Sequence, residues 1–137
     1  MGKVFTFGEI MMRLNPAGYG RFVQARSFEV SFAGSEANVA VCLAGFGDRA
    51  AFVSKLPTGE IGQMAINDLR RVGVDVSGVG RCPGRMGLFF LEKGASQRAS
   101  KVIYDRKDSV VSQSKPEDYD WDALFADADW FHFTGIT

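Results

Sequence analysis

The 137-residue sequence has few of the residues that would indicate a metal site, a disulfide framework or a strongly charged surface. It has one histidine, His132, and two cysteines, Cys42 and Cys82, which lack CxxC spacing. A structural zinc site would therefore lack ligands, and reduced thiols are expected. Sixteen basic residues balance sixteen acidic ones, so no net charge attracts nucleic acid or an anionic membrane.

Several other signals are also missing. No apolar run is long enough to cross a bilayer, and Met1–Lys3 does not open like a secretory signal. The motifs GxxxxGK[ST], GxSxG and HExxH are absent, and Gly45-Phe46-Gly47 lacks the third glycine of a dinucleotide fingerprint. We therefore expect a cytoplasmic protein that binds neither nucleic acid nor membranes. Its 46% of hydrophobic residues supply the core of one domain.

Continuous apolar runs alternate with helical patterns along the chain. Residues 3–8, 50–56 and 130–133 are apolar runs that predict buried strands. Residues 35–46 are apolar nearly all round, which predicts a buried helix, and residues 58–73 have an apolar stripe at helical spacing. Strands and helices that alternate at short spacing predict a parallel α/β core.

A second set of strands has only one apolar face. Residues 27–32 alternate between apolar and polar side chains, and residues 87–92 and 101–104 flank a turn-prone segment and predict a hairpin. Residues 13–26, with Pro16, are typical of a loop or hairpin. Half-buried strands do not fit inside a parallel core. We therefore expect them in a separate antiparallel sheet, inserted as a lid.

These patterns divide the single domain at residues 1–137 into two parts. The core is expected at about 1–9, 34–76 and 114–137, and the lid at about 10–33 and 77–113. The last strand of the core, residues 130–133, is aromatic and would form an exposed edge unless something pairs with it. Such an edge favours association with another chain.

One turn has the composition of a site for a small polar ligand. Gly34 lets a ligand approach the backbone closely, and Asn38 follows at the start of a helix. An amide side chain both donates and accepts hydrogen bonds, which suits sugar hydroxyls. The alternative is an ordinary strand-to-helix turn in which Ser35 or Asn38 satisfies the amides of the helix end.

The spacing of Gly34, Asn38, Gly47 and Gly59 resembles the N-terminal signature of the ribokinase-like (PfkB) carbohydrate kinases. The surrounding chain is most similar to 2-keto-3-deoxygluconate kinases. The resemblance implies a Rossmann-type parallel sheet with an inserted antiparallel β lid. It also implies an ATP-dependent kinase for 2-keto-3-deoxygluconate or a similar keto-deoxy sugar acid, with Gly34, Ser35 and Asn38 at the sugar hydroxyls.

The segment VIYDRKDS resembles the tyrosine-x-arginine element of the same kinases. The resemblance implies that Arg106 meets the substrate carboxylate, for which a planar two-pronged donor is suited, and that Tyr104 supplies a hydroxyl and an apolar wall. Phe89 stands where a tyrosine is common, and Asp105 where a second aromatic residue is common. On the local sequence alone, without the resemblance to the family, Phe89 and Tyr104 could belong to the lid core, and Arg106 could be a solvated charge.

Two further residues enter the predicted sugar site through the resemblance. Glu9 follows the first strand at a position where a polar residue often touches the sugar. The alternative is that Glu9 pairs with Arg13 or faces solvent. Ile136 lies in a segment that lines the site in related enzymes. No residue between Met1 and Thr137 is expected to be a catalytic base or a metal ligand.

The resemblance covers only the first part of the family's fold. The catalytic aspartate of a GAGD-type element and the site for ATP and magnesium lie in its C-terminal half, and no such element occurs here. The resemblance therefore predicts a truncated, substrate-binding part that is inactive alone, and a homodimer formed through the lid. Two alternatives stay open. They are a sibling kinase for a neutral sugar such as fructose or ribose, and a non-catalytic sugar-binding or dimerising fragment.

Overall fold

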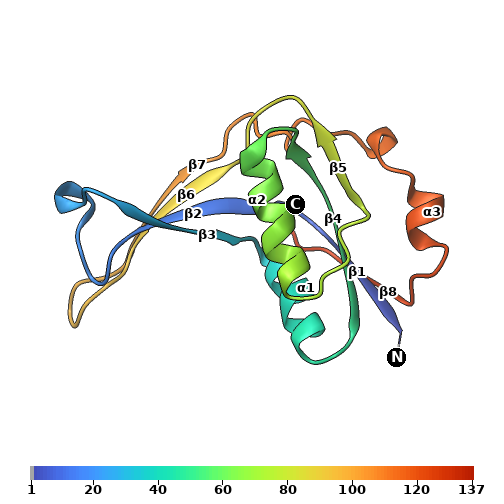
Figure 1. The fold of residues 1–137 in the computed structure, drawn as a ribbon, viewed down its shortest axis with the longest axis horizontal. Coiled ribbons are helices and arrows are strands. Elements are labelled where there is room, and N and C mark those ends of the chain that lie inside the picture. Colours follow the sequence, from blue (N-terminus) through green and yellow to red (C-terminus); the bar gives the residue numbers. More distant parts are fainter. Residues whose placement is uncertain (1) are drawn as a thin grey trace.

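The computed structural model describes residues 2–137, which form two four-stranded sheets (Figure 1). The core sheet has the order β5-β4-β1-β8, and all its neighbours are parallel. Its strands are β1 (Lys3–Phe7), β4 (Arg49–Pro57), β5 (Val79–Cys82) and β8 (Trp130–His132). The strands of the second sheet, which we call the lid sheet, are β2 (Met11–Pro16), β3 (Phe28–Ala33), β6 (Leu88–Glu92) and β7 (Lys101–Asp105). The predicted parallel core with a separate lid is confirmed.

The two faces of the core sheet pack against different helices. Alternate residues of β4 point to opposite faces, so Ala50 and Phe52 join the cluster formed with α1 (Ser35–Gly45) and α2 (Glu60–Arg71). Ala51 and Val53 face the other side, where Leu124 of α3 (Trp121–Phe125) packs. Short 3₁₀ helices complete the fold at η1 (Phe22–Gln24) and η2 (Pro116–Asp118). The core sheet is therefore the middle layer of three.

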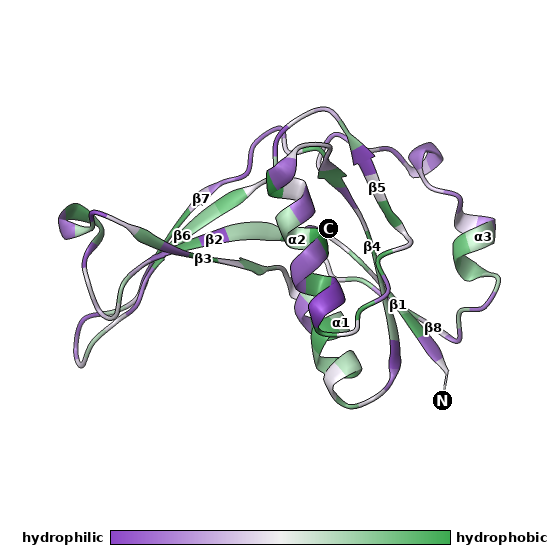
Figure 2. Cartoon of the chain, viewed as in Figure 1, coloured by the Kyte–Doolittle hydropathy of each residue, from purple (hydrophilic) through white to green (hydrophobic). Residues whose placement is uncertain are grey.

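The lid sheet has the order β3-β2-β6-β7 and projects to one side of the core (Figure 1). Its outer pairs are antiparallel, but β2 and β6 are parallel, so the sheet is mixed and not the purely antiparallel sheet that we expected. The parallel pair arises because two separate antiparallel units, β2–β3 and β6–β7, lie side by side. Figure 2 shows that β6 is hydrophobic along most of its length, as a strand in the middle of a sheet should be.

Two strands depart from the sequence-based expectations. Residues 13–16 were expected in a loop or hairpin, but they belong to β2, in which Met12 and Leu14 face the helices while Arg13 points to the other face. β5 pairs with β4 in the core sheet, although residues 77–113 were expected in the lid. Arg81 helps to place β5 there, because its guanidinium donates hydrogen bonds to the carbonyls of Pro57 at 3.0 Å and Thr58 at 3.1 Å.

The helix α1 is not buried on all sides, as its composition had suggested. Ala37 and Ala40 are in the core, whereas Val41 and Phe46, which follows the helix, are 36% and 76% exposed. The edge strand β8 likewise leaves Trp130 67% exposed, as expected for an unpaired edge. Within residues 2–137, no helix is both long and apolar enough to span a membrane.

Candidate binding cleft

The turn between β3 and α1 requires glycine because two chain segments approach each other closely. Gly34 is the N-cap of α1, and its backbone is extended (φ −170°, ψ 151°). A Cβ added to Gly34 would overlap the carbonyl oxygen of Glu9, which follows β1. The turn thereby brings the end of β1, the end of β3 and the start of α1 together. These are the places where the core sheet meets the lid sheet.

Asn38 lies one helical turn after Gly34. Its backbone N–H donates to the Gly34 carbonyl at 2.8 Å, and its Oδ1 accepts a long hydrogen bond of 3.5 Å from the Gly34 N–H. The helix-end role that we considered for Asn38 therefore exists, and it uses only the amide oxygen. Both Asn38 and Ser35 are exposed on the cleft side of the turn. The amide NH₂ of Asn38 can donate to a ligand hydroxyl.

The lid contributes an aromatic pair. Phe89 of β6 lies directly opposite Tyr104 of β7, and their ring centroids are 5.9 Å apart with a tilt of 34°. Tyr104 is 61% exposed, so it does not belong to a lid core, which was the alternative from sequence. A half-buried Phe89 beneath an exposed Tyr104 forms an apolar wall with one hydroxyl at its rim.

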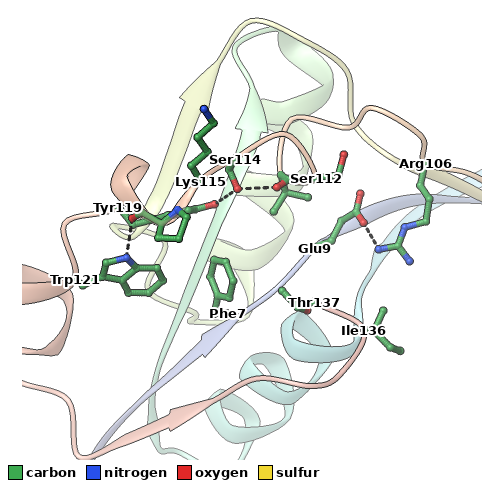
Figure 3. A pocket seen from close by; sticks show the side chains of 12 residues that line it. Phe7, Glu9, Arg106, Ser112, Ser114, Lys115, Tyr119, Trp121, Ile136 and Thr137 are labelled. Carbon is green, nitrogen blue, oxygen red and sulfur yellow. Dashed lines mark hydrogen bonds and ion pairs between the residues drawn. The ribbon is translucent and has the colours of Figure 1, made fainter.

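Glu9 and Arg106 form an ion pair across the junction of the two sheets. Arg106 Nη2 donates to Glu9 Oε2, and Figure 3 shows the two side chains pointing toward each other. The Glu9 side chain is buried, whereas the Arg106 side chain is 34% exposed at the cleft. Glu9 does not pair with Arg13, because Arg13 Nε donates to Ser31 Oγ at 2.8 Å between β2 and β3. Arg106 is therefore a held, partly buried cation and not a freely solvated one.

Glu36 is a buried residue of this region that sequence reasoning did not single out. It lies in the first turn of α1 and is 2% exposed. Its Oε1 accepts hydrogen bonds from the hydroxyls of Thr134 at 2.5 Å and Thr137 at 3.1 Å. Glu36 thereby fixes the turn after β8 against the start of α1. One sequence signal existed, since Glu36 is the only charged residue of an otherwise apolar segment, 35–47.

These residues line one cleft of about 240 Å³. It contains all eight residues that the sequence predicted for the site, namely Glu9, Gly34, Ser35, Asn38, Phe89, Tyr104, Arg106 and Ile136. It also contains Ala33, the small residue before Gly34 in the predicted turn, and three residues that were not predicted, namely Met11, Glu36 and Thr137. The structure thus brings the predicted set together from β1, β3, α1, β6, β7 and the chain after β8. The cleft combines polar groups that can hydrogen-bond, those of Ser35, Asn38 and Tyr104, with one guanidinium.

A second cleft of about 430 Å³ adjoins the first and shares Glu9, Arg106, Ile136 and Thr137 with it (Figure 3). Its far wall is aromatic, and there the Tyr119 hydroxyl donates to Ser114 Oγ at 2.9 Å. Burial raises the pKa of Tyr119, because it disfavours the charged phenolate. Because both clefts share Glu9 and Arg106, this ion pair lies between the two clefts.

The acidic residues of the clefts are not arranged as a metal site. Among residues 2–137, no group of three or more His, Cys, Asp or Glu side chains could hold a metal ion. Glu9 is engaged by Arg106, and Glu36 by two threonine hydroxyls. Magnesium in a nucleotide site is usually held by one or two free carboxylates together with phosphate oxygens and water. The residues described here therefore do not fit a magnesium–nucleotide site.

Sequence comparisons give the same family along the whole chain. Residues 1–137 match the family described as pfkB family carbohydrate kinase. A 2-dehydro-3-deoxygalactonokinase of Haloferax volcanii is 38% identical over 135 residues, which cover 98% of this chain and 42% of that relative. A 2-dehydro-3-deoxygluconokinase of Thermoproteus tenax is 34% identical over 139 residues, with 100% and 42% covered.

Solved structures agree with these matches. The crystal structure of 2-dehydro-3-deoxygluconokinase from Thermotoga maritima has a TM-score of 0.98 and 50% identity, and the match covers 100% of this chain and 42% of that one. A PfkB family carbohydrate kinase from Listeria grayi has a TM-score of 0.94 and 35% identity, with 98% and 42% covered. The chain therefore spans 42% of the length of each of these four relatives.

Proposed function

Because this chain belongs to the pfkB family of carbohydrate kinases, we propose that it forms the acceptor-binding part of an ATP-dependent kinase for a 2-keto-3-deoxy sugar acid. The observation that carries the proposal is the position of Arg106. Its guanidinium is held at the cleft opposite the hydroxyl-binding turn at Gly34. A sugar acid has hydroxyls along its chain and a carboxylate at one end, which matches this arrangement.

Arg106 favours an acid over a neutral sugar for a physical reason. A guanidinium presents five donors in a plane, and a carboxylate accepts two of them in parallel. Among residues 2–137 the guanidinium makes a single side-chain hydrogen bond, to Glu9, so several donors are free for a ligand. A neutral sugar offers no charge to a cation in this position. The exposed hydroxyl of Tyr104 lies on the same wall and is a second partner for the acid.

The other end of the acceptor is assigned to the β3–α1 turn. The Asn38 amide donates to a sugar hydroxyl, and Ser35 Oγ either donates or accepts. Gly34 lets the chain after β1 approach this turn closely, because a Cβ at Gly34 would overlap the Glu9 carbonyl oxygen. Phe89 packs against the apolar C3 methylene that a 3-deoxy sugar presents. This chain therefore binds the acceptor, orients it and shields part of it from water.

ATP with magnesium is proposed as the phosphoryl donor, in keeping with the family. When bound, it supplies the transferred phosphoryl group and neutralises its charge. Glu9 and Glu36, the two acids of the cleft, each accept a hydrogen bond from a protein side chain on one oxygen, and we assign the hydroxyl proton to neither of them. We therefore propose that these 137 residues bind the acceptor without phosphorylating it.

A homodimer formed through the lid sheet is also proposed. One face of this sheet has a cross-strand row in which Val30, Leu14, Phe90 and Ile103 are register partners. Val30 is 47% and Ile103 is 53% exposed, so the row leaves apolar surface in solvent. A second copy that packs on this face would bury it. Sedimentation analysis of the chain and of I103D tests this, since the charge should shift a dimer to monomer.

The acceptor proposal is tested by calorimetric titration with 2-keto-3-deoxygluconate and with fructose. R106A should lose at least about tenfold in affinity for the acid, because a charged hydrogen bond of about 1.5–3 kcal/mol is removed. The control is K107A, which removes an exposed neighbouring cation outside both clefts and should bind like the parent chain. If R106A loses affinity equally for the acid and for fructose, the proposal of a sugar-acid acceptor is overturned and a neutral sugar is favoured.

A further inference from the structure

The partner of Arg106 inside the protein is the feature that the proposed function leaves unexplained. Glu9 is 8% exposed, and its Oε2 accepts from Arg106 Nη2. Its second oxygen, Oε1, is buried and has no hydrogen-bond partner among residues 2–137. A buried carboxylate is costly unless it is paired, so Arg106 is essential to Glu9. Arg106 depends on Glu9 in turn, and this dependence affects how the guanidinium binds a ligand.

An arginine at a cleft has many conformations unless something holds it. Its long side chain carries substantial rotamer entropy, which a ligand must remove on binding. Arg106 directly follows β7, at the edge of the lid sheet, and Glu9 lies after the end of β1 in the core sheet. Their side chains meet between the two sheets. In Figure 3 the guanidinium lies beside Glu9 above Ile136 and Thr137. The contact thus fixes one edge of the guanidinium before any ligand arrives.

The backbone beside the pair leaves room for it. Gly87 precedes β6, and a Cβ built there would lie 2.5 Å from Glu9 Oε1 and 3.1 Å from the Arg106 Cβ. Any larger residue at this position would push the carboxylate or the arginine stem out of place. Packing therefore requires glycine at position 87, whatever its backbone angles. Gly87, Glu9 and Arg106 form one unit, which we call the arginine cradle.

We propose that Glu9 is a positioning residue that acts through Arg106, and that it does not itself contact the sugar. This inference rests on the proposed function, because it deepens the recognition of the acid by the same cleft. Glu9 holds Nη2 and leaves the other N–H groups of Arg106 directed to the cleft for the ligand carboxylate. Preorganisation of this kind raises affinity because the ordering cost is removed in advance.

The ligand-free test follows the side chain of Arg106 itself. The Nε–Hε resonance of Arg106, assigned with R106K, reports whether the guanidinium is ordered in the chain. We expect an ordered signal in the parent chain, motional averaging in E9A, and order close to the parent in E9Q, whose amide oxygen still accepts from Nη2. E29A, which removes an exposed acid on β3, is the control and should leave the signal unchanged. An equally ordered Arg106 in E9A overturns the proposal.

The second readout is affinity for 2-keto-3-deoxygluconate. E9A should bind the acid about tenfold more weakly than the parent chain, and E9Q should stay within about threefold, as rescue by the conservative variant requires. Equal or tighter binding by E9A would show that Glu9 competes with the ligand for Arg106, and would overturn the proposal. If the parent chain binds no acid, the proposed function fails, and the Arg106 resonance still decides the role of Glu9.

Discussion

The core sheet and the lid sheet use similar apolar residues and expose them very differently. In the core sheet, Phe52 and Val53 are both fully buried, because helices cover each face. In the lid sheet, Val30 and Ile103 are about half exposed, because only the base of the sheet packs against helices. The comparison indicates that the core sheet provides most of the buried apolar packing, whereas the lid sheet leaves apolar side chains in solvent, on the surface where a second copy is proposed to pack.

The largest effect should come from equal truncations in the two sheets. F52A removes a side chain with no exposed surface and should lower the free energy of unfolding by about 3–5 kcal/mol. F28A removes a side chain that is 39% exposed and contacts Phe90 at 5.7 Å between ring centroids, so about 1 kcal/mol is expected. Urea unfolding measures both. Similar losses in the two variants would contradict the division of roles.

A second pair of substitutions tests the junction between the sheets. G34A places a methyl group against the Glu9 carbonyl and should destabilise the chain by about 1–3 kcal/mol. G45A is the matched control, because a Cβ there meets nothing within 4 Å and alanine favours the helix, so a gain of about 0.5–1 kcal/mol is expected. Thermal unfolding distinguishes them. If G34A leaves the stability of the chain unchanged, β1 and α1 do not approach each other as described.

The smallest effect concerns the ion pair between half-buried Lys55 and exposed Asp118. Lys55 on β4 donates to Asp118 in η2 at 2.7 Å, and this hydrogen bond is the main reason that the pKa of Asp118 lies below its usual value of 3.8. A carboxyl group with a lowered pKa stabilises the fold above its unfolded pKa of about 3.9. That contribution is lost as the pH falls through the lower, folded value.

D118N should therefore be less stable than the parent chain at pH 5–7, and the difference should disappear as the pH is lowered below about 3.9. Urea unfolding at several pH values measures this. D105N, in which an exposed lid carboxylate beside Arg85 is removed, is the comparison variant. A difference between D118N and the parent chain that persists at the lowest pH would show that Asp118 stabilises by packing and not by its charge.

The sequence predicted those parts of the molecule whose signal is local. The strand predicted at residues 27–32 and the hairpin predicted from residues 87–92 and 101–104 depend on neighbouring side chains, and both are formed. The burial of β3 does not alternate as its sequence suggested, because Phe28 and Val30 are exposed. The region of β2 was misinterpreted because Arg13, Asn15 and Pro16 resemble a loop. In the sheet Arg13 lies on the face opposite Met12 and Leu14, and Pro16 occupies the strand end.

The parts that could not be predicted depend on contacts between distant residues. The partners of Glu36 are Thr134 and Thr137, about a hundred residues away, so its burial has no local signature beyond its isolation in an apolar segment. β5 belongs to the core sheet through its pairing with β4, and Arg81 adds hydrogen bonds to the carbonyls of Pro57 and Thr58 at the end of that strand. The eight predicted cleft residues do come together. Ligand contacts remain predictions for seven of them, whereas Glu9 is proposed to act through Arg106.

The most direct test of the central claim is an NMR titration of the chain with 2-keto-3-deoxygluconate, with fructose as the neutral control. We predict saturable shifts for the acid at Gly34 and Asn38 on the core side, and at Tyr104 and Arg106 on the lid side. Fructose should produce none of comparable size. Equal shifts with fructose, or shifts with the acid that avoid Arg106, would contradict a cleft built between the two sheets to bind a sugar acid.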